Sequence, residues 1–295
     1  MAMWKLLQIE LFKIFRKPRT YISFGAIAAI IFIIQLGLKF DGKSYVELLM
    51  GDVSDSFDIP YEKVLNGYFV AFVILNTLLI HVPLLVALVA GDVVAGEANM
   101  GTLRLLMTKP VSRVQLMLVK FAASVIYTVL LLVWMAVLAL VVSVLIFGTN
   151  DILISRNNVM EQIEKADILW RYIAAFAFAS VALSTVAALA FLLSVLAENS
   201  IGPIVATISI VIVLTILSEL RIPMYDNTVK PYLFTSHMLA WKGFFYSKTN
   251  TNGDVIRGSV ENLPAIARSL FILLAYITGF VTTGIVIFQK KDILS

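Results

Sequence analysis

One stretch of the chain matches the sequence pattern of a phosphate-binding loop. Residues 37–44 have the sequence GLKFDGKS, which fits G-x-x-x-x-G-K-[ST]. Phosphate binding by this pattern requires a strand before the loop and a helix after it, so that backbone N–H groups surround the phosphate. Here a long apolar segment precedes the match, and Asp41 and Glu47 bring negative charge close to it. We therefore interpret the match as coincidental.

Other residues that could perform covalent or metal chemistry are few. The chain has no cysteine, which excludes disulfides, thiolate metal ligands and cysteine catalysis. Its two histidines, His81 and His237, are expected in different regions of the protein, and neither lies in a cluster with metal-ligand spacing. We predict no catalytic residue, no metal site and no enzymatic activity in this chain.

Six stretches of 19 to 30 residues contain no charged side chain. A bilayer core about 30 Å thick needs roughly 20 apolar helical residues to cross it, and a helix satisfies its own backbone hydrogen bonds in lipid. We therefore predict an all-α polytopic membrane protein with one domain over residues 1–295. The predicted spans are about 20–38, 68–91, 121–147, 172–197, 201–219 and 268–289.

Residues 1–19 are predicted to form an amphipathic helix in the membrane interface. Its apolar face carries Trp4, Leu7, Leu11, Ile14 and Phe15. Its opposite face carries Lys5, Glu10, Lys13, Arg16 and Lys17. Positive charge before the first span favours a cytoplasmic N-terminus, and six spans return the C-terminus to the same side. We predict a multi-pass protein of the cell membrane whose basic residues face lipid headgroups rather than nucleic acid.

The loop 92–115, between the second and third spans, contains leucine and methionine side chains that we expect to be exposed. Residues 102–107 are predicted to form a short helix that Pro110 ends. Arg113 and Lys120 are expected at the lipid boundary. Such a helix suits the docking of a soluble partner, whereas an interfacial loop without a partner is the alternative that the pattern leaves open.

The same loop resembles the signature of type-2 ABC transporter permeases. The matching residues are Gly96-Glu97, the GTLRLL sequence of residues 101–106, the KPVSR sequence of residues 109–113, and Lys120. The resemblance extends over the chain, because the basic N-terminal helix, the six spans, the short turn at 198–203 and the aromatic segment before the last span also match. These permeases are the membrane subunits of export-type transporters driven by ATP.

The resemblance implies a transport subunit that does not itself bind ATP. ATP and magnesium would bind to a separate ABC ATPase, present in two copies, together with a second copy of this chain or a related permease and, in some relatives, accessory subunits. The loop 92–115 would contain a coupling helix that inserts into the ATPase. The residues expected to face the ATPase are Glu97, Gly101, Thr102, Leu103, Arg104, Leu106 and Met107. The uncharged spans favour export of an amphipathic or lipid-like substrate.

Asn76, Thr77 and His81 form a polar strip in the second predicted span. The strip either lines a transport path or an interface between two permeases, or it hydrogen-bonds to other helices within one bundle. An ATP-independent secondary carrier or channel is the alternative function, because a substrate site can consist of backbone and hydroxyl groups. A proton-coupled carrier usually needs an ionisable group inside the membrane, and the charge-free stretches offer only His81 near neutral pH. The carrier alternative also leaves the loop motif without a role.

Overall fold

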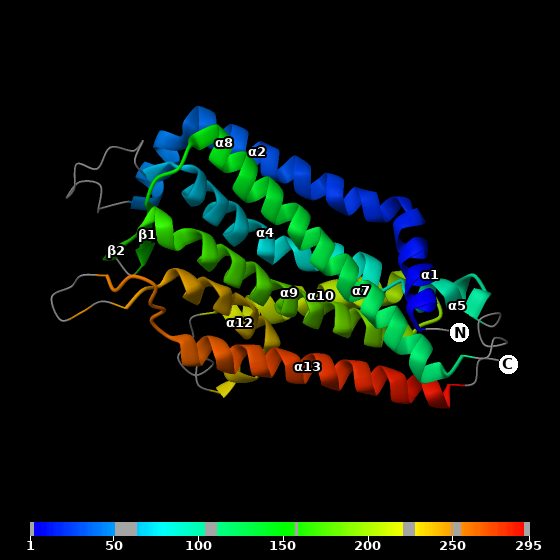
Figure 1. Cartoon of the computed structure of the whole chain (residues 1–295). Coiled ribbons are helices and arrows are strands. Elements are labelled where there is room, and N and C mark those ends of the chain that lie inside the picture. Colours follow the sequence, from blue (N-terminus) through cyan, green and yellow to red (C-terminus); the bar gives the residue numbers. More distant parts are fainter. Residues whose placement is uncertain are drawn as a thin grey trace.

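The computed structural model describes residues 3–50, 64–103, 111–156, 159–220, 228–248, 250 and 255–291. Six helical segments in it are long and apolar enough to cross a membrane, so the prediction of an all-α polytopic membrane protein is confirmed. They lie side by side in one elongated bundle (Figure 1). The spans are α2 (Pro18–Met50), α4 (Gly67–Ala90), the continuous run of α7 (Arg113–Ala136), η2 (Val137–Val142) and α8 (Ser143–Phe147), then α9 (Lys165–Leu196), α10 (Ile201–Glu219) and α13 (Leu263–Lys290).

Short elements cover the two ends of the bundle. The helices α1 (Met3–Arg16) and α5 (Ala95–Asn99) lie at the end where the chain begins and ends, which we call the termini end (Figure 1). At the opposite end, the hairpin end, strands β1 (Ile152–Arg156) and β2 (Val159–Ile163) pair antiparallel, with Ile152 opposite Ile163. Three short helices follow α10, namely η3 (Lys230–Tyr232), α12 (Phe234–Met238) and η4 (Leu239–Phe245). This β-hairpin was not predicted from the sequence.

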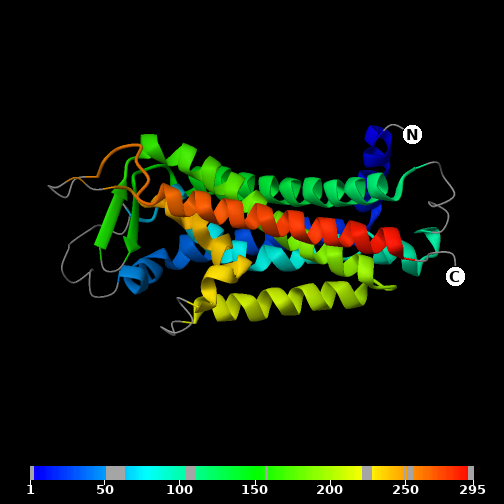
Figure 2. The ribbon, with the colours of Figure 1, turned by 90° about the horizontal axis from the view of Figure 1, so that it is seen from below.

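The helix α9 is the centre of the bundle. It packs against α4, α7, α10, α13 and η4. Its alanines Ala182, Ala187 and Ala190 are buried, and a Cβ atom added at Gly284 of α13 would lie 3.2 Å from the Phe191 ring. Small residues let helices approach closely, and in lipid this close packing holds helices together. By contrast, α10 lies on the outside of the bundle (Figure 2), where it contacts α9, α4 and α12, and few of its residues are buried.

The aromatic segment between α10 and α13 folds into the bundle. Trp241 and Phe245 of η4 are almost fully buried. The Phe245 ring lies 4.9 Å from that of Tyr172 and 5.1 Å from that of Phe72, in edge-to-face geometry. Such pairs stabilise beyond their buried area. The aromatic segment therefore packs between the spans near the hairpin end.

The first and third spans share polar contacts inside the membrane region. The Gln35 amide of α2 donates hydrogen bonds to the Leu138 carbonyl at 3.1 Å and to the Ser143 hydroxyl at 2.9 Å. Leu138 belongs to η2, a π-helical turn, and such turns alter the regular backbone pairing. Residues 37–44, the match to a phosphate-binding loop, lie within α2 at a kink where Asp41 is not helical. Helix rather than strand precedes the match, so the strand–loop–helix geometry that phosphate binding requires does not form there.

The fourth span begins at Lys165, earlier than the predicted residue 172, and so includes three charged residues, Lys165, Asp167 and Arg171. The Arg171 guanidinium is fully buried and pairs with Asp167, with an Nη2–Oδ2 distance of 2.7 Å. It also donates to the Phe244 and Ser259 carbonyls. Because these partners satisfy the charge, the helix can extend through residues that the charge-free criterion excluded. The Arg171 contacts tie α9 to the aromatic segment.

We predict that replacing Arg171 with methionine lowers the free energy of unfolding by about 3–5 kcal/mol, because Asp167 would remain buried without its cationic partner. SDS-induced unfolding in mixed micelles would measure the loss. The matched control is Arg257→Met, because Arg257 pairs with Glu164 and both side chains are more than half exposed. That control should change stability by less than about 1 kcal/mol. Equal losses of unfolding free energy in the two variants would contradict a stabilising buried ion pair between Arg171 and Asp167.

Candidate functional site

Four charged side chains meet at the termini end of the bundle, and we call them the Lys120 cluster: Glu10, Lys13, Glu97 and Lys120. The Lys120 Nζ atom lies 2.9 Å from Glu10 Oε2 and 2.7 Å from Glu97 Oε2. The Lys13 Nζ atom lies 2.7 Å from Glu10 Oε1 and 2.7 Å from Glu97 Oε1. Each carboxylate therefore bridges the two ammonium groups. The cluster is neutral in sum and joins α1, α5 and α7.

Lys120 is the fully buried member of this cluster. Ser112 caps the N-terminus of α7, where its hydroxyl accepts a hydrogen bond from Gln115 N at 3.1 Å. Lys120 lies two turns further along α7, and its side chain also donates to the Val93 carbonyl at 3.2 Å. A buried ammonium is stable only when it is paired and hydrogen-bonded. The position of Lys120 therefore requires both α1 and α5 to dock against α7.

The pairing shifts the pKa values of the two cluster members that α1 supplies, Glu10 and Lys13. Burial alone raises the pKa of Glu10, but the ammonium groups of Lys120 and Lys13 outweigh it and hold the pKa below the ordinary value of 4.5. Burial alone lowers the pKa of Lys13, but hydrogen bonds to Glu10 and Glu97 outweigh it and raise the pKa above the ordinary value of 10.5. Both groups are therefore charged across the physiological range.

The helix α1 buries a different set of side chains from the one that the sequence predicted. Leu6, Glu10 and Ile14 are buried against the bundle, whereas Trp4 and Phe12 are exposed. Glu10 was predicted on the polar face of this helix, but its side chain is buried against Lys120 of α7. The sequence of one helix does not show which residue of another helix lies opposite it. The exposed aromatic side chains suit contact with lipid, as an interfacial helix requires.

A second group of charges surrounds Asp92, directly after α4. The Asp92 Oδ2 atom pairs with both Lys17 and Arg19, and its Oδ1 atom accepts a hydrogen bond from the Ser200 hydroxyl. We call these four residues the Asp92 cluster. A Cβ atom at Gly96 would lie 2.4 Å from Asp92 Oδ1, so glycine is required at that position for the carboxylate to fit. The cluster joins the starts of α2 and α10 to the end of α4.

The loop after α4 is also fixed to the central span. The Ser194 hydroxyl of α9 accepts hydrogen bonds from Val94 N at 3.1 Å and Ala95 N at 2.9 Å, at the start of α5. Together with the two clusters, this contact joins the described part of the loop to α1, α2, α7, α9 and the start of α10. The beginning of the loop is thus a rigid junction.

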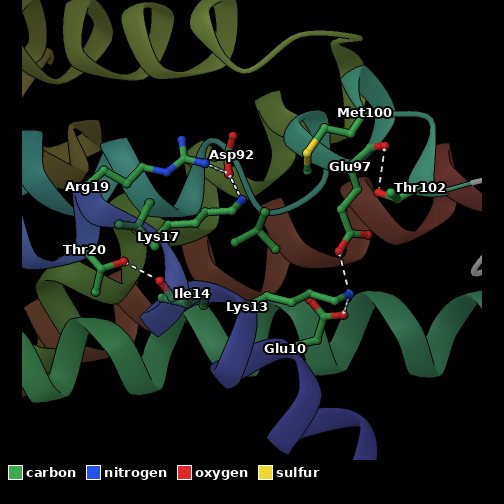
Figure 3. Close-up of a pocket in the computed structure, with 12 residues that line it drawn as sticks. Glu10, Lys13, Ile14, Lys17, Arg19, Thr20, Asp92, Glu97, Met100 and Thr102 are labelled. Atoms are coloured by element: carbon green, nitrogen blue, oxygen red, sulfur yellow. Dashed lines mark hydrogen bonds and ion pairs between the residues drawn. The ribbon is translucent and has the colours of Figure 1, made fainter.

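A half-open cavity of about 420 Å³ lies between α1, the start of α2 and the loop after α4 (Figure 3). Members of both clusters form its charged wall, with Lys13 and Glu97 on one side and Lys17 and Arg19 on the other. Met100 and Thr102 lie at its edge (Figure 3). Ile14, Val89 and Val93 supply an apolar lining.

The described part of loop 92–115 differs from its prediction. Its first helix is α5, which precedes the predicted helix at 102–107. Glu97 and Leu103 are buried, so neither side chain faces outward as expected. Gly101 and Thr102 are exposed, as is their neighbour Met100. The remaining residues expected to face the ATPase, Arg104, Leu106 and Met107, lie outside the described residues.

Lys120 does not lie at the lipid boundary as expected, and Arg113 makes contacts between helices that the sequence did not predict. Arg113 donates hydrogen bonds to the carbonyls of Gln289 and Lys291 at 2.9 and 3.0 Å, and so joins the start of α7 to the end of α13. Lys120 lies inside the protein. Both basic side chains thus serve contacts between helices. The partners of these two side chains could be identified only once the positions of the neighbouring helices were known.

Asn76, Thr77 and His81 share an exposed side of α4. The His81 Nδ1 atom lies 2.8 Å from the Thr77 carbonyl of the same helix. Within the described residues, none of the three side chains makes a hydrogen bond to another helix. The structure therefore does not support the alternative in which this strip holds one bundle together.

Two signals for the missed contacts were present in the sequence. Glu10 is an acidic residue among the basic residues of the first helix, and Lys120 directly precedes a long charge-free stretch. Asp92 likewise directly follows the second span. Such isolated charges at span ends indicate buried pairing, although sequence alone does not identify the partners. Among the described residues, no group of three His, Asp or Glu side chains is arranged to hold a metal ion.

The chain belongs to a family described as "Protein of unknown function (DUF2705)", whose model matches residues 26–294. It is also similar to the "Uncharacterized protein YhcI" of Bacillus subtilis (strain 168), with 29% identity over 120 residues. That similarity covers 38% of this chain and 37% of the Bacillus protein, so it spans little more than a third of either. The descriptions of the family and of the relative name no function.

We predict that Lys120→Met lowers the free energy of unfolding by about 3 kcal/mol, because two buried carboxylates would share one ammonium. The control Lys5→Met removes an exposed lysine of α1 and should change stability by less than about 0.5 kcal/mol. The double variant Lys120→Met with Glu10→Gln should recover part of the loss, since one unpaired carboxylate is removed. SDS-induced unfolding would compare them, and a Lys120→Met loss no larger than the control would contradict the cluster.

We predict that the docking of α1 against α7 weakens only at acidic or strongly alkaline pH, where Glu10 or Lys13 loses its charge. Ionised Glu10 stabilises docking above pH 4.5, and this contribution is lost as pH falls through its lowered folded-state pKa. Charged Lys13 contributes fully below pH 10.5, and its contribution is lost as pH rises through its raised folded-state pKa. Distances between spin labels on α1 and α7 would follow both limits. An unchanged acid transition in a Glu10→Gln variant would contradict the assignment to Glu10.

Proposed function

We propose that this chain is the membrane-spanning permease subunit of an ATP-driven ABC transporter, powered by a separate ATPase subunit. The chain itself binds no ATP in this proposal and is not an enzyme. Two copies of the ATPase and a second copy of this chain or a related permease complete the transporter. Export of an amphipathic or lipid-like substrate is the proposed activity.

The observation that carries this proposal is the combination of a rigid junction and an exposed tip in loop 92–115. Met100, Gly101 and Thr102 are exposed at the tip. Directly before them, the loop is fixed to α7 through Glu97 and Lys120, and to α9 through Ser194. A partner that moves the tip would therefore displace several spans together. A coupling element between an ATPase and a transport path needs this property.

The distribution of charge supports an orientation with the termini in the cytoplasm. Lys5 and Arg16 are exposed on α1, and Lys290 ends α13 at the same end of the bundle. Basic residues next to membrane spans favour the cytoplasmic side. This orientation places the exposed loop tip on the side where ATP is available. The cell membrane is the proposed location.

The exposed strip on α4 supports a second permease subunit and an uncharged path. Asn76, Thr77 and His81 would contact lipid tails if α4 remained uncovered, which is unfavourable for polar groups. A neighbouring subunit, or a path between two subunits, would cover them. The strip offers amide, hydroxyl and imidazole groups rather than carboxylates, which supports an amphipathic substrate.

We predict that Met100→Asp reduces co-purification of the ATPase by at least about tenfold, because a carboxylate would replace an exposed apolar contact at the tip. The control Ile256→Asp makes the same kind of change at an exposed apolar residue of the hairpin end. Neither variant should lower the free energy of unfolding of the isolated chain. Mass spectrometry of the tagged chain purified in mild detergent would measure the associated ATPase.

The same purification tests the proposal as a whole. An ABC ATPase that co-purifies, together with vanadate-sensitive ATP hydrolysis, is the expected result. A chain that purifies without an ATPase, and whose transport in proteoliposomes needs no ATP, would contradict the proposal. That result would favour the secondary carrier or channel and direct attention to His81 and its neighbours.

A further inference from the structure

The cavity beside α1 lies at the level where lipid headgroups meet the protein. Its wall includes Lys17 and Arg19, which directly precede the apolar run of α2, and Asp92, which directly follows α4. The ends of two spans therefore mark this cavity as an interfacial site. The amphipathic helix α1, which carries exposed Trp4 and Phe12, lies beside it. A cavity at this depth is accessible to phospholipid as well as to solutes.

The charges around the cavity do not balance. Among the described residues, the lining includes three cations and three carboxylates. Two of those carboxylates, Glu10 and Glu97, also neutralise Lys120, which lies behind the wall. The excess positive charge resides at Asp92, because both Lys17 and Arg19 pair with its one carboxylate. The Asp92 cluster alone carries one cation more than it has anions.

The excess cations face accessible space. The Lys17 side chain is 32% exposed and the Arg19 side chain is 27% exposed, whereas that of Asp92 is 5% exposed. The known contact of Arg19 uses Nη2, so other guanidinium N–H groups remain to donate. A planar guanidinium beside an ammonium matches the oxygens of a phosphate ester. Ile14, Val89 and Val93 add an apolar part to the lining of the same cavity.

We propose that this cavity binds the phosphate group of an anionic phospholipid from the adjoining leaflet. Lys17 and Arg19 hold the phosphate, and the apolar lining contacts the glycerol backbone and the first carbons of the acyl chains. Since Met100 and Thr102 lie at the edge of the cavity, the bound lipid also contacts the exposed tip of loop 92–115. Phospholipid binding would thereby stabilise the arrangement of α1 against the loop. This inference does not depend on the proposed transport activity, because it concerns the isolated chain.

The test uses the full chain reconstituted in nanodiscs of phosphatidylcholine with a minor fraction of phosphatidylglycerol. Native mass spectrometry after release into detergent counts the phosphatidylglycerol that stays bound. Wild type should retain it, and Arg19→Gln should reduce retention by about tenfold, because a charge-assisted contact to phosphate is lost. Arg19→Gln should still fold, since Lys17 continues to neutralise Asp92. The matched control is Arg16→Gln, which removes the same charge from an exposed residue of α1 outside the cavity lining.

A second variant removes space without removing charge. Met100→Trp places an indole at the edge of the cavity and should also lower phosphatidylglycerol retention. Equal retention in wild type, Arg19→Gln and Met100→Trp would overturn the proposal, as would equal losses in Arg19→Gln and Arg16→Gln. Displacement of the lipid by an equal concentration of sn-glycerol 3-phosphate would also overturn it, because a soluble phosphate ester would then be the ligand. None of these measurements involves an ATPase, so they fail or succeed separately from the transport proposal.

Discussion

A buried charge must be paired, and at the termini end that requirement determines how the elements meet. Lys120 is fully buried at the start of the third span, so two carboxylates have to reach it. One comes from α1 and the other from α5, and Lys13 then neutralises the remaining charge. Docking of the N-terminal helix and the position of the loop after α4 are consequences of one ammonium group.

The hairpin end is also held together by a buried ion pair. Arg171 is buried beside Asp167, and its further donors reach carbonyls of the segment that follows α10. Between these two ends, the spans hold together through small residues on α9 and through the Gln35 contacts of α2. The bundle is thus fixed at both ends by ion pairs and packed by apolar contacts in the middle. The helix α10 and the polar side of α4 take little part in this core.

Much of the architecture could be predicted because the bilayer imposes one dominant constraint. Each charge-free stretch corresponds to a helix, and the short turn at 198–203 corresponds to the junction of α9 and α10. The helix ends were less accurate. The helix α9 starts at Lys165 rather than at residue 172, because Arg171 and Asp167 neutralise each other inside it, and α2 continues past the predicted residue 38. The candidate site was the least predictable part. Glu97 was selected for a partner surface, but it lies inside the protein beside Lys120.

The number of spans, the all-α class and the amphipathic nature of the first helix could be predicted from the amino-acid sequence alone. Those properties follow from local composition and from the thickness of the hydrocarbon core. They do not depend on which helices pack against each other. Which charged residues pair depends on how the helices pack, because Glu10 and Lys120 are 110 positions apart in the chain. Likewise, only the packing of α9 determined that Ser194 would hold the start of α5. A charge at a span end predicts that a partner exists, whereas the identity of the partner depends on how the helices meet.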